Sequence, residues 1–152
     1  KKVIEKNPDI IVHIDADMQY DSKDIPKLLN LLAKKKSGLV IGVRKKNIGL
    51  VKKIGNFIFT TLTSLIIKKK LKDSQSGFRA LNIELAKKIH ITSKYTYTQE
   101  QIIRTNWLGY SIYEVPIKFK KRKHGKSRLI SNIFVYGFNA FYDIIKLIIH
   151  SK

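Results

Sequence analysis

The segment from Ile10 to Asp21 constrains the fold of this chain more than any other. It reads Ile-Ile-Val-His-Ile-Asp-Ala-Asp-Met-Gln-Tyr-Asp, so an apolar, largely β-branched run ends abruptly at Asp15, and a second carboxylate follows at Asp17. Such a run, bounded by polar residues, predicts a buried β-strand. The two carboxylates would then lie at the carboxyl edge of a sheet, where open α/β folds bind ligands.

The residues at this strand end allow two chemical interpretations. Asp15 and Asp17 lie one residue apart in an expected extended segment, so both can point towards one hard cation, and Gln19 adds a neutral oxygen. Mg²⁺ and Mn²⁺ prefer oxygen ligands and commonly take the remaining ones from water and substrate phosphates. The alternative is a solvated acidic turn, since Asp is common in turns.

The residues that follow predict an α/β chain. Apolar side chains recur at helical spacing between positions 25 and 32, and residues 39–43 form a second β-branched apolar run. We therefore expect a strand–helix–strand unit with a right-handed crossover. If its two strands are parallel, Arg44 reaches the same sheet edge as Asp15.

The rest of the chain predicts four more helices and two more strands. The helices are expected over residues 49–67, 82–90, 98–108 and 130–149. The turn-rich loop of residues 73–80 is expected to run into a short strand, and the other strand is expected over 111–119. Pro116 indicates an edge position for that strand, because proline cannot donate a ladder hydrogen bond. The last helix contains too many polar groups for a comfortable bilayer crossing, so an amphipathic helix at a membrane interface fits better.

The charge of the chain implies an anionic partner. Its formal charge is +20, from 31 Lys and Arg against 11 Asp and Glu, which suits nucleic acid, an acidic membrane or phosphorylated substrates. The absence of Cys excludes disulfides and thiolate metal sites. A length of 152 residues with 43% hydrophobic content fits one folded domain.

Four motifs occur in a characteristic order along the chain. They are Asp15-Ala16-Asp17-Met18-Gln19, Ser76-Gly77-Phe78-Arg79, Glu114-Val115-Pro116-Ile117 and Arg122-Lys123-His124-Gly125-Lys126-Ser127-Arg128-Leu129. Together they resemble the dolichyl-phosphate mannosyltransferase-like branch of the family 2 glycosyltransferases and are similar to bacterial polyprenyl-phosphate glucosyltransferases. The resemblance implies a GT-A-type, Rossmann-like α/β fold, with residues 1–128 as a partial catalytic domain and 129–152 as the interfacial helix.

The resemblance also implies an activity. The expected reaction moves a hexosyl group, with mannose as the expected sugar, from a nucleotide-diphosphate sugar such as GDP-mannose or UDP-glucose to a polyprenyl (dolichyl) phosphate. It is expected to invert the anomeric centre at the cytoplasmic face of a membrane. By resemblance, Asp15, Asp17 and Gln19 bind Mg²⁺ or Mn²⁺ and the donor diphosphate, whose developing charge the metal neutralises.

The same resemblance implies roles for further residues. The catalytic candidates are Asp17, Asp73 and Arg122; further donor contacts are Arg44 and Glu100; acceptor-phosphate contacts are Arg44, Arg122, Lys126 and Ser127. Arginine forks and hydroxyl donors match phosphate oxygens. Two alternatives stay open: Asp73 as a plain turn residue, and Arg79 as either a phosphate contact or half of a structural ion pair.

The chain departs from the family pattern at its beginning. The family opens with a strand carrying a Pro-x-Tyr-Asn-Glu-like motif that binds the nucleotide, and these residues do not contain it. The expectation is an incomplete donor pocket: this polypeptide alone either binds nucleotide sugar poorly or needs a second chain. One rival interpretation is an inactive or partner-dependent membrane-binding homologue. The other is a nucleic-acid-binding module, which we disfavour because no such signature occurs and no aromatic residues interleave the basic loop.

Overall fold

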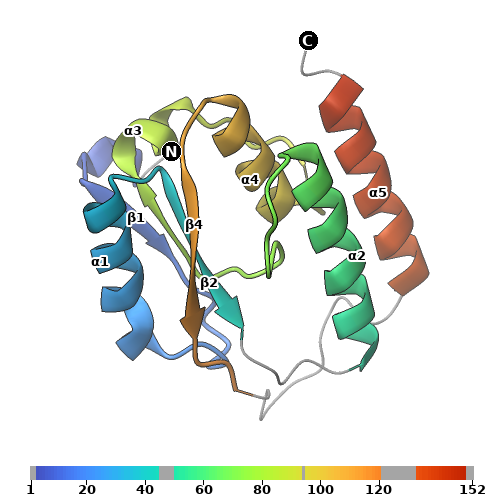
Figure 1. Ribbon diagram of the computed structural model, residues 1–152, viewed down its shortest axis with the longest axis horizontal. Helices are drawn as coiled ribbons and strands as arrows, with labels where there is room; N and C mark the ends of the chain where they lie inside the picture. The colour runs from blue at the N-terminus through green and yellow to red at the C-terminus, as the bar shows by residue number, and fades with distance from the viewer. Residues whose placement is uncertain (1–2, 45–49, 94, 121–132, 150–152) are drawn as a thin grey trace.

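A mixed four-stranded sheet with helices on both faces forms the centre of the molecule (Figure 1). The computed structural model describes residues 3–44, 50–93, 95–120 and 133–149. The strands are β1 (Ile10–His13), β2 (Leu39–Arg44), β3 (Arg79–Asn82) and β4 (Ile112–Ile117). The helices are α1 (Ile25–Lys35), α2 (Leu50–Ile66), α3 (Ile83–Lys88), α4 (Tyr97–Trp107) and α5 (Ile133–Ile149), with 3₁₀ turns at Ile4–Lys6 and Ser22–Asp24.

The strand order is β1-β3-β2-β4, so the two strands of the predicted strand–helix–strand unit are not neighbours in the sheet. β3 lies between β1 and β2 and runs antiparallel to both, while β2 and β4 are parallel. Ala80 and Leu81 of β3 are buried, as residues of an interior strand must be. Because β1 and β2 both run opposite to β3, they still point the same way, and their carboxyl ends share one edge.

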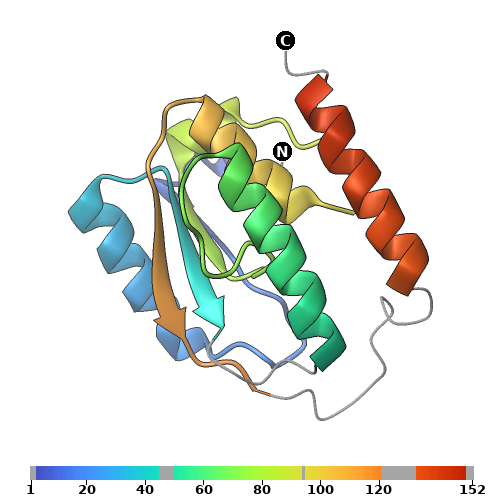
Figure 2. The same cartoon turned by 45° about the vertical axis from the view of Figure 1, so that its right-hand side comes forward.

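Helices cover both faces of the sheet (Figure 2), and an apolar cluster fills the space on each face. On one face, Leu28 and Leu32 of α1 pack against Val40 and Ala80. On the other face, the alternate residues Leu39, Ile41 and Leu81 pack against the other helices, with Ile102 and Ile103 of α4 at the centre. Burying both faces of a sheet between helices is the usual solution for an α/β domain.

Local sequence signals mark the beginning of α3 and the end of α4, as predicted. Asn82 caps α3, since its side chain accepts a hydrogen bond from the Leu85 N–H at 2.8 Å. Gly109 follows α4 with a φ of +75°, a left-handed conformation that favours glycine. The predicted edge position of the strand that contains Pro116 is confirmed, because β4 lies at one edge of the sheet.

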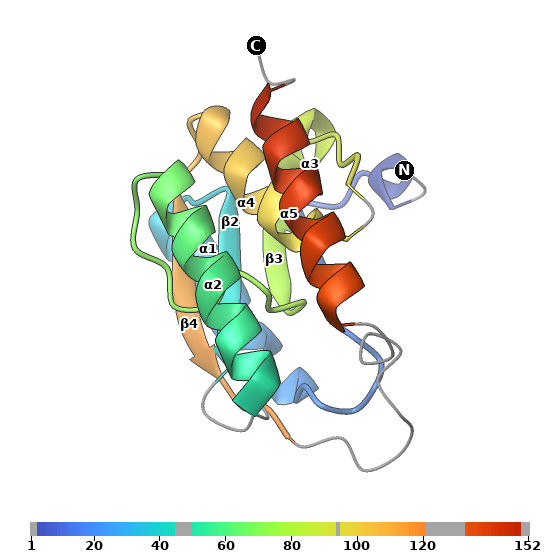
Figure 3. The same cartoon turned by 90° about the vertical axis from the view of Figure 1, so that its right-hand side faces the viewer.

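The helices α2 and α5 lie side by side on the outer face of the molecule (Figure 3). Phe59 of α2 packs with Ala140 and Ile144 of α5, and Asp143 accepts a hydrogen bond from the backbone N–H of Tyr95. Within the described ranges, every helix is too short or too polar to cross a bilayer. The domain boundary predicted at residue 128 lies outside the described residues.

Candidate functional site

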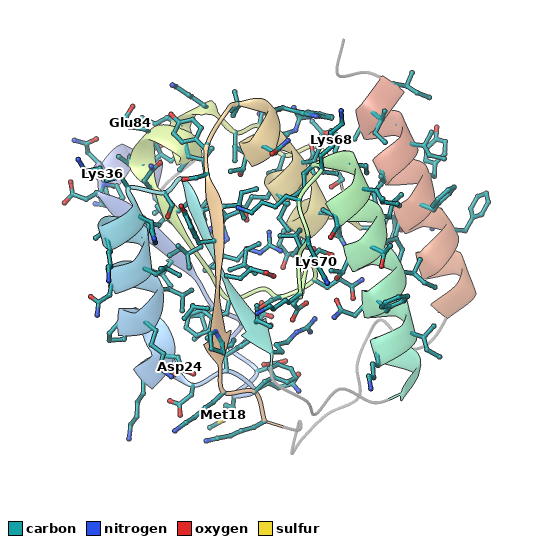
Figure 4. The ribbon with its side chains drawn as sticks, viewed as in Figure 1. Met18, Asp24, Lys36, Lys68, Lys70 and Glu84 are labelled. Carbon is teal, nitrogen blue, oxygen red and sulfur yellow. The ribbon has the colours of Figure 1, made fainter. Side chains whose placement is uncertain are left out.

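The acidic loop after β1 turns sharply and is not extended as predicted. The Asp17 Oδ1 accepts a hydrogen bond from the Gln19 N–H at 3.2 Å, which folds the loop back on itself. Between them, Met18 has a φ of +61°, a region that L-residues rarely adopt, and its side chain is 86% exposed. Figure 4 labels Met18 at the sheet edge where β2 and β4 end.

Asp15 is seated directly on the Ser-Gly-Phe-Arg loop. A Cβ atom added to Gly77 would lie 2.6 Å from Oδ2 of Asp15, so only glycine allows this approach. The N–H of Gly77 also donates to the Tyr20 hydroxyl at 3.1 Å. Two motifs about sixty positions apart in the chain therefore meet at one point.

Arg44 and Asp73 form a bidentate ion pair beside this loop. Nε of Arg44 lies 2.7 Å from Oδ2 of Asp73, Nη2 lies 2.8 Å from Oδ1, and the Arg44 backbone N–H donates to Oδ2 at 3.3 Å. Burial alone would lower the pKa of Arg44, but the hydrogen bond and charge of Asp73 outweigh it, and the pKa is raised. The two predicted site residues are thus in direct contact, and the Asp15 charge acts on the same guanidinium.

The segment that follows β4 is paired with the acidic loop. The Lys120 N–H donates to the Gln19 carbonyl at 2.8 Å, and the Gln19 side-chain amide donates to the Lys120 carbonyl at 3.1 Å. Tyr20 forms an antiparallel bridge with Phe119, and their rings meet edge to face. The basic motif begins two residues later, but Arg122, Lys126 and Ser127 lie outside the described residues, so their roles stay predictions.

Glu100 is fully buried among hydrogen-bond donors of its own chain. Its carboxylate accepts bonds from the Ser93 N–H at 2.6 Å, from Arg104 Nε at 2.7 Å, and from the backbone and hydroxyl of Thr92. Burial acts to raise the pKa of Glu100, but these hydrogen bonds outweigh it, and the pKa is lowered. The side chain ties the segment before α4 to the helix; its predicted contact with the donor sugar stays a prediction.

Arg79 fits neither of the two roles weighed for it. Its guanidinium is completely buried and donates to the backbone carbonyls of Ser74, Ser76 and Thr98 and to the side chain of Gln101. All four acceptors are neutral, and burial lowers the pKa of Arg79 to about 10. The residue joins the Ser-Gly-Phe-Arg loop to α4 and is closed off from any phosphate.

Two tyrosines at the site were missed by sequence reasoning. Burial raises the pKa values of Tyr20 and Tyr97, and the negative charge of Asp15 acts in the same direction on both. Tyr20 belongs to the opening segment, so its position beside the acidic loop was a usable signal. Tyr97 comes from α4, and nothing in the local sequence links it to Asp15.

The oxygen atoms at this edge suit a hard divalent cation. In the part of the chain that the structure describes, no group of three His, Cys, Asp or Glu side chains could hold a metal ion. The donors present are the carboxylates of Asp15 and Asp17 and the side-chain oxygen of Gln19. Such a small set fits Mg²⁺ or Mn²⁺, which complete their coordination with water and substrate phosphates.

Solved structures identify the fold. No family model matches the chain. Glucosyl-3-phosphoglycerate synthase from Mycobacterium tuberculosis, in complex with phosphoglyceric acid, superposes with a TM-score of 0.71 at 16% identity, covering 96% of this chain and 52% of that one. The same enzyme in complex with Mn²⁺, UDP-glucose and glycerol 3-phosphate gives a TM-score of 0.65 with the same identity and coverage. The fold is that of the GT-A glycosyltransferases.

Three curated relatives are named as sugar transferases that act on polyprenyl phosphates. A UDP-N-acetylglucosamine–dolichyl-phosphate N-acetylglucosaminyltransferase of Methanococcus voltae is 31% identical over 156 residues, covering 97% of this chain and 61% of the relative. A dolichyl-phosphate hexose transferase of Haloferax volcanii is 29% identical over 153 residues, covering 99% and 66%. An undecaprenyl-phosphate mannosyltransferase of Micrococcus luteus is 29% identical over 140 residues, covering 86% and 57%.

The chain is similar over most of its length to these polyprenyl-phosphate sugar transferases. It spans about 60% of the length of the relatives that it matches.

Proposed function

We propose that this chain provides the metal-binding part of the active site of a polyprenyl-phosphate hexosyltransferase. The observation that carries the proposal is the seating of Asp15 on Gly77 next to the Arg44–Asp73 pair. This arrangement gathers carboxylates and a guanidinium at the carboxyl edge of the sheet, where a nucleotide diphosphate would bind. Mannose is the sugar that we propose, transferred with inversion.

Asp15, Asp17 and Gln19 would hold Mg²⁺ or Mn²⁺, and the metal would neutralise the leaving diphosphate. The complex of the M. tuberculosis enzyme with Mn²⁺ and UDP-glucose supports a divalent metal. In this proposal Asp73 orients Arg44 towards the phosphates. Glu100 holds the segment before α4 in place, beside the sugar that it is proposed to contact.

The acceptor phosphate would bind on the other side of the acidic loop. Support comes from the pairing of Gln19 with Lys120, which lies two positions before the basic motif in the chain. Arg122, Lys126 and Ser127 are the proposed acceptor contacts. The acceptor is already an anion, so a positively charged binding segment serves it better than a strong general base.

A further strand is proposed to pair with β1. Ile10, Ile11 and Val12 are apolar but only half-buried, and β3 is the single strand paired with them in the described ranges. The unpaired backbone N–H and C=O groups of such an edge strand can form hydrogen bonds with another strand. We propose that it comes from another segment of the protein or from a second chain, and that it completes the nucleotide pocket.

The enzyme would work at the cytoplasmic face of a membrane. The outward faces of α2 and α5 carry large apolar side chains, including Phe57 and Leu65 on α2 and Phe138 and Phe141 on α5. Helices with such faces lie in the headgroup region of a bilayer, and the net charge of +20 favours anionic lipids.

The Asp17→Asn variant tests the proposal. Transfer of labelled sugar from GDP-mannose or UDP-glucose to polyprenyl phosphate is measured in membranes from cells that express the gene. We expect at least about a hundredfold loss, because a metal ligand at the leaving group is removed. Chelation should abolish the parent activity, and Mg²⁺ or Mn²⁺ should restore it.

Asp21→Asn is the matched control. It makes the same charge change four residues away, and asparagine can still accept the hydrogen bond that Asp21 takes from the Lys23 N–H. Its transfer rate should equal that of the parent. Parent-level transfer by Asp17→Asn would refute the site, and no metal-dependent transfer by the parent would favour the inactive homologue.

A further inference from the structure

A groove of about 540 Å³ lies along the outer side of α2, away from the acidic loop. One wall is the helix itself, with Phe57, Thr61 and Leu65 on successive turns. The other wall is the segment of residues 68–72, which returns beside the helix after α2 ends. We call this the α2 groove.

The wall of residues 68–72 is fastened to the body of the protein. The N–H of Lys69 donates to the Ser64 carbonyl at 3.0 Å, and the N–H of Leu71 donates to the Ser64 hydroxyl at 3.1 Å. The Lys69 ammonium donates to the Ile112 carbonyl of β4 at 2.6 Å. The α2 groove therefore has a built wall, held by bonds to two elements.

The charge along this wall has one sign. Lys68, Lys70 and Lys72 are exposed, and none of them forms an ion pair with a described acidic side chain. The Glu114 carboxylate accepts hydrogen bonds from the backbone N–H groups of Lys72 and Asp73 at the end of the segment. Figure 4 shows Lys68 and Lys70 at different heights along α2. One wall of the groove thus carries lysines, and the other carries apolar side chains of α2.

The α2 wall of the groove continues into an exposed apolar surface. Phe57 is 71% exposed and Leu65 is 70% exposed, and Ile54 and Ile58 extend the same helix face. Exposed apolar area of this size on a helix marks a partner or a membrane. Because lysines border it, the ligand that complements it has an apolar part and an anionic part.

We propose that the α2 groove binds the phosphate headgroup of an anionic membrane phospholipid. The lysines at positions 68, 70 and 72 contact the phosphate, while Phe57 and Leu65 contact the first methylenes of an acyl chain. This goes beyond the proposed function, because it requires neither nucleotide sugar nor transfer. The lysine wall runs directly into Asp73, so a lipid held there anchors the active-site edge close to the membrane.

The first experiment compares vesicle binding of two triple variants. Lys68→Gln/Lys70→Gln/Lys72→Gln removes the lysine wall, and Lys34→Gln/Lys35→Gln/Lys36→Gln makes the same charge change at the end of α1. The sets are also matched in backbone, since Lys68 and Lys36 both have left-handed φ values, of +53° and +45°. Co-sedimentation is measured with phosphatidylcholine vesicles, with and without phosphatidylglycerol.

We expect the wall variant to bind the phosphatidylglycerol vesicles at least about tenfold more weakly than the parent. The vesicle affinity of the α1 variant should fall by less than about threefold. Equal losses in the two variants would show an effect of net charge alone and overturn the proposal. Equal melting temperatures confirm that both variants are folded. Sugar transfer in detergent without phosphatidylglycerol should be unchanged in both, so a failure here is distinct from a failure of the proposed function.

The second experiment separates a lipid from free phosphate. Monomeric short-chain phosphatidylglycerol is titrated into the chain, and the NMR signals of the Thr61 and Leu65 amides are followed. We expect saturable shifts that the wall variant loses. If inorganic phosphate shifts the same signals at equal concentration, the α2 groove binds a bare anion and the proposed lipid is wrong.

Discussion

A single missing Cβ atom sets the position of the first carboxylate. Asp15 can rest on the Ser-Gly-Phe-Arg loop only because residue 77 is glycine. The same loop carries the N–H that binds the Tyr20 hydroxyl, so the acidic loop has two contacts with it. At this scale the site depends on close backbone approach as much as on charged groups.

Replacing Gly77 by alanine should therefore impair transfer and leave the protein folded. The new Cβ would displace the Asp15 carboxylate, and a displacement of about 1 Å at a reacting centre costs on the order of a hundredfold in rate. The measurement is sugar transfer together with the melting temperature. Gly55→Ala in α2 is the control, since nothing lies within 4 Å of a Cβ there; transfer at the parent rate by the Gly77 variant would contradict the placement of Asp15.

At the scale of elements, hydrogen bonds from Thr92, Ser93 and Arg104 converge on Glu100. They lower the pKa of Glu100 in the folded protein below its ordinary value of 4.5. The ionised form is therefore favoured in the folded state. Its stabilisation is present above the unfolded pKa and is lost as the pH falls through the folded pKa.

The free energy of unfolding should consequently fall as the pH drops below about 4.5. Glu100→Gln should reduce this dependence, because its amide does not titrate, and it should be less stable than the parent near neutral pH. Denaturant titrations at a series of pH values would show it. Glu84→Gln, on the exposed surface of α3, serves as the control, and a Glu100 variant with the parent's full pH dependence would refute the assignment.

Element types and ends were predictable from the sequence, whereas their partners were not. Helical spacing, Asn82 as a cap and Gly109 as a terminator are local signals, so they indicated α1, α3 and α4 correctly. The insertion of β3 between β1 and β2 depends on pairing between distant segments. The neutral partners of Arg79 come from residues 74–76 and from α4, so its burial was equally invisible.

For the molecule as a whole, strand direction explains which part of the site was foreseen. Asp15 and Arg44 share an edge because β1 and β2 point the same way, although β3 lies between them. The net positive charge and the apolar faces of two helices are also properties of the whole molecule, and both favour binding to an anionic membrane. Neither α2 nor α5 buries its outward face against the described part of the chain, which leaves two adjacent apolar surfaces.

Phe57→Ser/Phe138→Ser should weaken membrane binding at salt concentrations that screen the lysines. The two side chains are 71% and 75% exposed, so their removal should leave the fold intact. Losing both from a membrane interface should reduce vesicle affinity by about tenfold or more. Trp107→Ser, on α4 and 41% exposed, provides the control. An equal loss in that variant would show that the α2–α5 surface is not the membrane-binding face.

The pairing of Gln19 with Lys120 gives a reason for an amide at that position. Its NH₂ group donates to the Lys120 carbonyl, and its oxygen is the atom proposed as a metal ligand. A carboxylate would attract a cation more strongly but could not donate, and an aliphatic side chain could do neither. The Gln19 side chain thus links the loop proposed to bind the donor to the segment proposed to bind the acceptor. Because the two segments are hydrogen-bonded to each other, a displacement of the donor-binding loop would also move the acceptor-binding segment, and the reverse would hold.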